Sequence, residues 1–203
     1  GSLLMHLKLT CSHCRRHIEL EGENLGGAIK CPNCERKINL PSNILEVGQM
    51  LGGFRVERHL GSGAMGAVYL AEQVSMQREV ALKVLPPEVT TDKAEIDNFM
   101  HEVRLLAKLD HPHIVAAYEA GEDDGNYFMA MTYVDGETLE NRVSRDGPMD
   151  EYDTLQAMRR IASALKYAWT RHQVLHRDIK PDNIIIDEAM SPRLLDLGIS
   201  QRS

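Results

Sequence analysis

The sequence predicts an α+β protein in which a small metal-stabilised module precedes a larger domain with a β-rich first half and a helical second half. Three observations support this class. All four cysteines of the 203-residue chain lie in its first 34 residues. Runs rich in β-branched and aromatic residues flank a glycine cluster after Phe54. Apolar residues recur at helical spacing from Asp92 to Leu109 and from Asp153 to His172.

The composition limits the classes of function. The chain is 43% apolar and 26% charged, as globular proteins are. Its net charge of −7 disfavours non-specific nucleic-acid binding, because no excess of Lys and Arg is available to neutralise phosphates. No apolar run reaches the roughly 18–20 residues that cross a bilayer, and no secretory signal is visible. The leading "GSLL" is interpreted as a tag scar before Met5. We expect a cytoplasmic chain, or the cytoplasmic part of a protein anchored in a membrane beyond residue 203.

The first module contains two C-x-x-C pairs, Cys11 with Cys14 and Cys31 with Cys34. Each pair places two sulfurs on one tight turn, and two such knuckles supply the four thiolates of a tetrahedral Zn²⁺ site. A segment of about 35 residues buries little core, so a metal has to stabilise it. "HIEL" and "GGAIK" are predicted as short strands between the knuckles. The module resembles a rubredoxin-like zinc ribbon, which implies a partner but does not name it.

Alternatives to zinc remain at this point. Iron could occupy the same four thiolates, and one C-x-x-C could have a redox role. Disulfides are disfavoured in a reducing compartment. His13 and His17 could serve as ligands in a different arrangement, although with four cysteines present we expect them on the surface.

A linker rich in Pro, Ser, Asn and Gly separates this module from the next one. Beyond it, strands are predicted on both sides of the cluster Gly61-Ser62-Gly63-Ala64-Met65-Gly66, which Val68 follows. Glycines let a backbone approach phosphates closely. A G-x-G-x-x-G alone is weak evidence, and flanking strands disfavour a dinucleotide-binding strand–loop–helix unit. A hairpin folded over a nucleotide fits better.

A lysine interrupts the next apolar strand, predicted from Glu79 to Leu85. Lys83 needs a partner if this strand is buried, unless the strand lies at an edge and the lysine reaches solvent. The following helix offers Glu102, beside an apolar face made by Ile96, Phe99, Val103 and Leu106. An ion pair with Glu102 would leave the ammonium of Lys83 ready to bind phosphates.

Two antiparallel strands are predicted around the turn "EDDGN", with Met129 to Met131 in the core. Thr132 to Val134 would connect them to a second lobe. A helix is predicted from Asp153 to His172, and its expected apolar face comprises Leu155, Met158, Ile161, Ala162, Leu165 and Trp169. Trp169 is interpreted as a core residue.

Five motifs in order resemble the protein kinase fold, and most of all the bacterial eukaryotic-like (Hanks-type) serine/threonine kinases. They are "GSGAMGAV", "VALK", Glu102, "HRDIKPDN" and "DLG". The resemblance covers about 150 residues and implies a β-rich N-lobe and an incomplete helical C-lobe. The expected domains are a zinc ribbon at 5–40, a linker at 41–52, the N-lobe at 53–134 and the partial C-lobe at 135–203.

The resemblance implies ATP and Mg²⁺ as cofactors and assigns the reacting groups. Asp178 would accept or orient the proton of the substrate hydroxyl, and Lys180 would touch the transferring phosphoryl group. Lys83, fixed by Glu102, would hold the α- and β-phosphates. Asn183 and Asp196 would bind Mg²⁺. The lysine of "KPDN" resembles the serine/threonine class rather than the tyrosine class, so the expected partner is a protein hydroxyl.

The remaining implied roles concern the nucleotide. The backbone from Gly61 to Gly66 would cover the phosphates. The adenine would contact Val68 and Ala81 as a roof, Met131 as gatekeeper, and the hinge formed by Thr132, Tyr133 and Val134. Asp135 or Glu137 would hold the ribose, without a basis for choosing between them. His176 is interpreted as structural, and Arg177 would pair with a phosphorylated activation segment.

The sequence departs from the family pattern in two places. Leu197 replaces the phenylalanine of "DFG", and an apolar leucine can fill the same packing role. Only "ISQRS" follows Gly198, without an activation segment or an "APE" motif. We therefore expect a fragment of a longer kinase with low activity, whose exposed apolar surface favours self-association.

Two other functions are weighed against the kinase. The chain could be a scaffold in which the zinc ribbon recruits a partner beside a non-catalytic kinase-like domain. A scaffold has no chemical need to retain all five of Lys83, Glu102, Asp178, Asn183 and Asp196. A small-molecule phosphotransferase is disfavoured because the glycine loop occurs together with "HRDIKPDN".

Overall fold

The computed structural model describes residues 5–11, 14, 16–22, 28–39, 45–63, 66–85 and 93–195. The chain divides into two compact units, one formed by residues 1–96 with 119–131 and the other by residues 97–118 with 132–203. Within the described ranges, no helix is long and apolar enough to cross a membrane.

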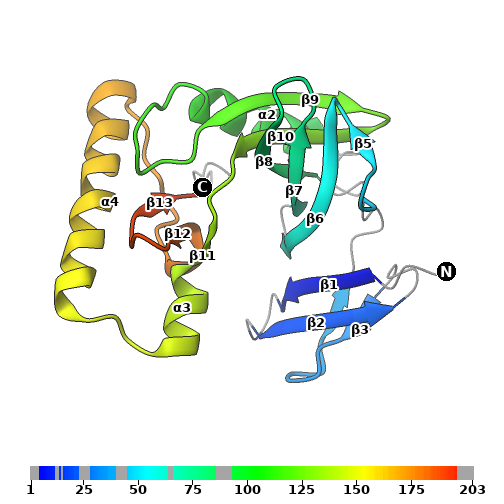
Figure 1. Cartoon of the computed structure of the whole chain (residues 1–203), viewed down its shortest axis with the longest axis horizontal. Helices are drawn as coiled ribbons and strands as arrows, with labels where there is room; N and C mark the ends of the chain where they lie inside the picture. The colour runs from blue at the N-terminus through cyan, green and yellow to red at the C-terminus, as the bar shows by residue number, and fades with distance from the viewer. Residues whose placement is uncertain are drawn as a thin grey trace. The chain divides into compact units, whose positions relative to one another are not determined.

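The first unit contains one large sheet whose strands follow the order β2-β1-β6-β7-β8-β10-β9, with β5 paired to β6 (Figure 1). A separate two-stranded sheet, β3 with β4, completes the cysteine-rich module. The strand bounds are β1 Met5–Thr10, β2 His17–Gly22, β3 Ala28–Lys30, β4 Lys37–Asn39, β5 Met50–Leu51, β6 Phe54–Gly63, β7 Gly66–Gln73, β8 Arg78–Val84, β9 Ala117–Asp123 and β10 Asn126–Thr132.

One face of the central strands forms the core of this unit. Successive side chains of a strand point to opposite faces, so every second residue enters that core. The buried cluster comprises Leu45, Leu51, Phe54, Val56, Ala67, Tyr69, Ala71, Val80, Leu82, Val84, Phe128 and Ala130. The intervening residues of β7, β8 and β10 therefore point to the other face, and this alternation decides which side chains can meet a nucleotide.

Two turns show why these strands pair as they do. Asp124 and Gly125 join β9 to β10, and both have positive φ, 49° and 76°. A two-residue turn of this kind matches the twist of a hairpin, so "EDDGN" forms the predicted turn. Gly66 opens β7 with φ 114°, and a Cβ there would overlap the carbonyl of Val84. Gly66 is thus required both by its conformation and by the neighbouring strand β8.

The second unit combines helices with a small three-stranded sheet ordered β11-β12-β13. The backbone of residues 113–115 is fixed to β13, because Leu194 donates to His113 O at 2.9 Å and Val115 donates to Leu194 O at 3.0 Å. The element bounds are α2 Lys93–Leu106, α3 Leu139–Asp146, α4 Glu151–His172, the 3₁₀ helix η1 Pro181–Asn183, β11 Gly136–Thr138, β12 Ile184–Asp187 and β13 Pro192–Leu194.

Capping side chains set the starts of α3 and α4. Thr138 caps α3 by accepting from the N–H of Asn141, and Asp150 caps α4 by accepting from the N–H of Asp153. The helix α4 therefore begins at Glu151, two residues before the expected start. Its C-cap, Gln173, adopts a left-handed conformation with φ 55°.

The expected apolar face of α4 is wrong in phase. Its buried residues are Ala157, Ile161, Ala164 and Ala168. Leu155 and Trp169 are 60% and 46% exposed, so Trp169 is not the core residue that was expected. Of the expected face, only Ile161 is buried, and it lies in one stripe with the three alanines, whereas Leu155, Met158 and Trp169 are exposed.

Candidate active site and metal centre

The polar stretch after His176 folds into a loop around the carboxylate of Asp178. Its Oδ2 accepts from Lys180 Nζ at 2.7 Å and from the side-chain amide of Asn183 at 2.8 Å. The same amide also donates to the main-chain oxygen of Asp178 at 2.9 Å. The hydrogen bond from the Lys180 ammonium is the largest cause and lowers the pKa of the Asp178 carboxyl; burial opposes it, and the Asn183 amide lowers the pKa further. Asp178 is therefore held as an oriented anion.

The backbone around this carboxylate is equally fixed. His176 is buried, and its Nε2 lies 2.9 Å from the carbonyl oxygen of Leu195. The N–H of Leu195 donates to Asn183 O at 2.9 Å. Arg177 adopts φ 62°, a conformation that turns the chain sharply just before Asp178. His176 thus has a hydrogen-bond partner in the backbone, consistent with the structural role expected for it.

Three predicted nucleotide residues lie on one rung of the first unit's sheet. Gly61 of β6 pairs with Val68 of β7, and Val68 pairs with Lys83 of β8. Directly paired residues of antiparallel strands point to the same face. Ala81 lies two residues from Lys83 and therefore shares that face. Met131 alternates with the core residue Ala130 and points the same way, so these side chains gather opposite the core.

Lys83 does not lie at an edge. The strand β8 runs between β7 and β10, and Lys83 is only 3% exposed. The alternative of a solvated edge lysine is therefore wrong. Glu102 is likewise buried within α2, at 7% exposure. Lys83 belongs to the first unit and Glu102 to the second, so their ion pair stays a prediction.

Some predicted residues already have a backbone group engaged in a hydrogen bond, and others lie outside the described ranges. The N–H of Thr132 donates to Ala116 O at 2.9 Å, which leaves its carbonyl as the group that could face a base. Val134 is buried. Ala64, Met65 and Asp196 fall outside the described residues.

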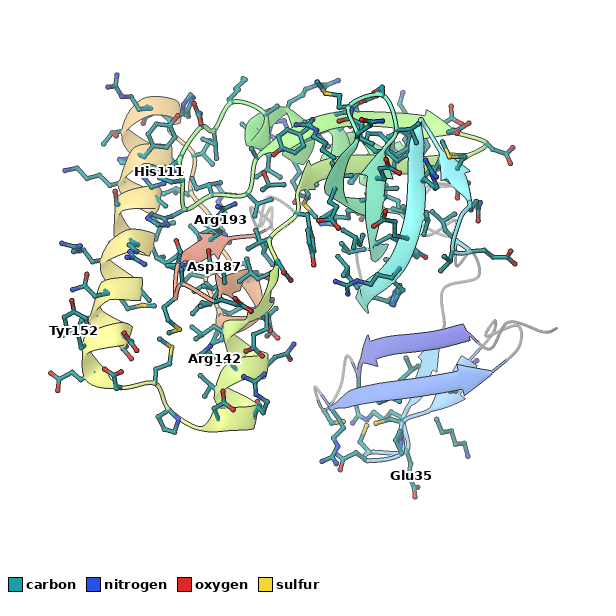
Figure 2. All side chains as sticks on the ribbon, viewed as in Figure 1. Glu35, His111, Arg142, Tyr152, Asp187 and Arg193 are labelled. Atoms are coloured by element: carbon teal, nitrogen blue, oxygen red, sulfur yellow. The ribbon has the colours of Figure 1, made fainter. Side chains whose placement is uncertain are left out.

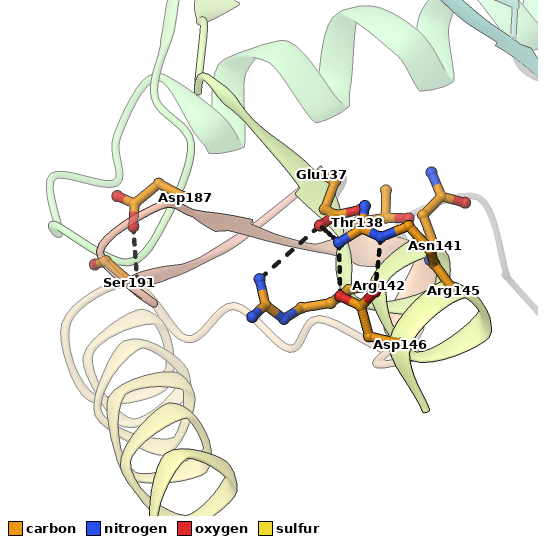
Figure 3. Close-up of polar contacts among 8 residues, drawn as sticks. All are labelled: Glu137, Thr138, Asn141, Arg142, Arg145, Asp146, Asp187 and Ser191. Atoms are coloured by element: carbon orange, nitrogen blue, oxygen red, sulfur yellow. Dashed lines mark hydrogen bonds and ion pairs between the residues drawn. The ribbon is translucent and has the colours of Figure 1, made fainter. Parts of the chain in front are cut away.

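The two ribose candidates differ in their partners. Glu137 receives a bidentate contact from Arg145, at 2.6 and 2.8 Å, and Arg145 also binds Asp146 (Figure 3). Arg142 adds a longer contact of 3.9 Å to Glu137. Asp135 accepts a longer bond of 3.3 Å from the hydroxyl of Tyr133. Glu137 is thus held by ion pairs to α3, whereas Asp135 makes a weaker hydrogen bond with Tyr133.

The glycine-rich strand contains a polar pair that was not predicted from the sequence. His59 Nε2 lies 2.8 Å from the hydroxyl oxygen of Ser62, and the His59 ring packs edge-on against Tyr69. Burial lowers the pKa of His59 to about 4, although a backbone hydrogen bond at Gly61 opposes the shift. The ring is therefore neutral at neutral pH. A histidine two residues before the glycine cluster was the signal available in the sequence.

The four cysteines meet at one point in the first module. The ligand atoms of Cys11, Cys14, Cys31 and Cys34 all lie within 4.8 Å of one another. Two of the sulfur–sulfur distances are 3.7 Å, from Cys11 to Cys34, and 3.5 Å, from Cys14 to Cys31. Tetrahedral zinc with bonds of about 2.3 Å requires separations of about 3.8 Å. The donor set and its spacing therefore fit a Zn²⁺ ion.

The two knuckles are local copies of each other. Cys11 donates its N–H to Arg16 O at 2.9 Å, and Cys31 donates to Arg36 O at the same distance. In both knuckles an isoleucine seven residues after the first cysteine packs against the sulfurs: Ile18 and Ile38. The repeat C-x-x-C-x-R-x-I is visible in the sequence and is a further signal for two equivalent knuckles. Hydrogen bonding from Asn33, followed by the Arg16 backbone, lowers the pKa of Cys14 to about 6.

Comparison with known proteins agrees with this geometry. The model of the protein kinase domain matches residues 54–203. Among curated relatives, the serine/threonine-protein kinase PrkC of Bacillus subtilis is 39% identical over 155 residues, covering 76% of this chain and 24% of its own length. PknJ of Mycobacterium tuberculosis is 40% identical over 163 residues, covering 77% and 27%. The chain thus spans about a quarter of the length of these relatives.

Solved structures show the same likeness. The kinase domain of Mycobacterium tuberculosis PknI superposes with a TM-score of 0.67 at 35% identity, covering 77% of this chain and 62% of that one. The apo form of PpkA-294 gives a TM-score of 0.71 at 30% identity, covering 78% and 63%. The chain belongs to the protein kinase domain family. That domain implies ATP and Mg²⁺, and the cysteine cluster is compatible with zinc.

Proposed function

We propose that this protein is an ATP-dependent serine/threonine protein kinase. The observation that carries the proposal is the Asp178 carboxylate held between Lys180 and Asn183. Phosphoryl transfer depends on positioning and on neutralising charge rather than on covalent chemistry. A carboxylate fixed in the charged form can accept or orient the proton of a Ser or Thr hydroxyl. The ammonium beside it can neutralise charge that develops on the transferred phosphoryl group.

Nucleotide binding is assigned to the face opposite the core of the first unit. Gly61, Val68 and Lys83 share one rung of that face. Backbone N–H groups of the glycine-rich loop would contact the phosphates, and Val68 and Ala81 would pack on the adenine. Mg²⁺, held by Asn183 and Asp196, would neutralise the phosphates. Asp135 is the better ribose ligand, because Glu137 is tied to Arg145.

Zn²⁺ is proposed as the ion of the first module, coordinated by the four cysteine thiolates. Its part is to fold this module: where the structure describes burial, the module's core comprises Cys11, Ile18, Cys31 and Ile38, with Cys14, Ile29 and Cys34 packed against them. The same proposal includes three further points: the module binds a partner, the substrate is a protein with a Ser or Thr hydroxyl, and the location is cytoplasmic. The scaffold alternative is not favoured by the relatives, which are named as kinases.

The decisive experiment pairs two variants from the same loop. Asp178→Asn removes the charge of the proposed proton acceptor but keeps the shape of its side chain. Asp182→Asn removes an equal charge four residues away. In the full-length protein, Asp178→Asn should lower phosphoryl transfer to a generic Ser/Thr substrate by about 10²–10⁴-fold. Asp182→Asn should keep it within about threefold. The affinity of the 203-residue chain for Mg-ATP should survive both changes. Unchanged transfer by Asp178→Asn, or no ATP binding by the wild type, would overturn the assignment.

A further inference from the structure

The outer edge of β6, the strand that carries the glycine-rich loop, is covered by two other strands. At its beginning, Phe54 and Arg55 pair with Leu51 and Met50 of β5. Near its end, Ser62 pairs in parallel with Leu9 of β1, the first strand of the cysteine module. An edge strand offers unpaired N–H and C=O groups to any added strand. The cysteine module therefore joins the sheet at the loop itself.

Ser62 is held from three directions. Its backbone pairs with Ala67 of β7 on one side and with Leu9 of β1 on the other. Its hydroxyl lies 2.8 Å from His59 Nε2. The β6–β7 register shifts between His59 and Gly61, and such an irregularity re-aims the residues that follow it. The start of the glycine cluster is thus positioned both by its own strand and by β1.

The strand that reaches Ser62 leads directly to the metal ligands. β1 ends at Thr10, and Cys11 follows it. β1 pairs along its whole length with β2, from Met5 opposite Gly22 to Thr10 opposite His17. A single residue, Thr10, therefore separates the pairing point Leu9 from the thiolate of Cys11. Because so small a module depends on its metal to fold, the order of β1 depends on the metal as well.

We propose that the cysteine module clamps the glycine-rich loop through β1, so that metal occupancy and nucleotide binding are coupled. The inference rests on the proposed function, which places the nucleotide phosphates under this loop. A loop already fixed at Ser62 loses less conformational freedom when it closes on phosphates. Metal should therefore tighten nucleotide binding. By linkage, Mg-ATP should tighten metal binding by the same factor.

The first test measures both directions of the coupling. Removing zinc with a zinc-selective chelator should raise the Kd for Mg-ATP by about fivefold or more. Saturating Mg-ATP should lower the Kd for Zn²⁺ by the same factor in a competition titration. Leu9→Pro should abolish both effects. Leu7→Pro is the control. It disturbs the pairing of β1 with β2 equally, because Leu7 pairs with Leu20, but it spares Leu9, the residue that pairs with Ser62. Both variants should still bind one zinc per chain.

The second test does not need the nucleotide. Hydrogen exchange of a peptide covering residues 58–63 should accelerate when zinc is removed, while exchange around the Leu70–Ala81 pair should stay unchanged. Identical exchange of residues 58–63 with and without zinc would overturn the clamp, as would an equal Mg-ATP affinity in both metal states. A chain that binds no Mg-ATP in any metal state refutes the proposed function instead, and the exchange measurement then decides on the clamp alone.

Discussion

Asn183 donates two hydrogen bonds to Asp178 from one amide nitrogen, at 2.8 Å to Oδ2 and at 2.9 Å to the main-chain oxygen. The two residues should therefore be energetically coupled. In a double-mutant cycle with Asp178→Ala and Asn183→Ala, we expect a coupling of about 0.5–3 kcal/mol in the free energy of unfolding. Urea denaturation of the four proteins measures it. Strictly additive effects would show that the contact contributes nothing to stability.

Gly66 cannot be replaced without moving β8. Gly66→Ala would force a methyl group into the carbonyl of Val84 at φ 114°, and should lower the free energy of unfolding by about 1–3 kcal/mol. Gly61→Ala is the matched control, because open space surrounds its Cβ position. Thermal unfolding should show a clear loss for the first and a small change for the second. Equal losses would contradict the described hairpin.

Tyr69 ties the segment before the sheet to the core. Its buried hydroxyl accepts from the N–H of Leu45 at 3.1 Å. Tyr69→Phe should cost about 1–3 kcal/mol, because the buried N–H of Leu45 loses its partner. Tyr152→Phe, at a residue that is 70% exposed and points away from α4 (Figure 2), should leave stability nearly unchanged. A Tyr69→Phe protein as stable as the wild type would argue against this bond.

His59 should make stability depend on pH. Burial lowers its pKa from 6.5 to about 4, so between these values the unfolded chain binds a proton that the folded chain does not. The free energy of unfolding should therefore fall as the pH drops from about 6.5 to about 4. His59→Gln should flatten this part of the profile. Ser62→Ala should not, because it removes the hydrogen bond but leaves the ring buried. A wild-type profile that rises on acidification would contradict the assignment.

The cysteine module should contain one Zn²⁺ per chain by elemental analysis. Cys11→Ser should lower the zinc content and unfold the module, because a structural site needs all four ligands. His17→Ala should retain a full equivalent, since the four thiolates already complete the coordination. Zinc loss in His17→Ala, or a folded module without metal, would require a different ligand set.

The sequence predicted those features that rest on local chemistry. The glycine cluster, the "EDDGN" turn and Lys83 in a buried strand each require a particular residue type at a particular position, and the structure contains the turn and the buried lysine as expected. The resemblance to protein kinases placed Asp178, Lys180 and Asn183 together, and the structure joins them by hydrogen bonds. Their roles in catalysis stay predictions.

What the sequence did not predict depends on packing between distant segments. In α4, large apolar residues lie on more than one side, and only contact with other elements selects the stripe of Ile161 and three alanines as the buried face. The strand β1 alternates apolar and polar residues from Met5 to Thr10, a signal that was present but overlooked. The pairing of its Leu9 with Ser62 could not be foreseen, because strand register between residues so far apart in the sequence has no local signature.

The covered edge of β6 also bears on how this protein behaves in concentrated solution. A strand edge left open is a template on which another copy can add its own strand. Here the same chain fills both ends of that edge, with β5 and with β1. A metal-starved protein would lose one of these two covers, so zinc supply during synthesis would protect the chain from edge-to-edge aggregation as well as folding the cysteine module.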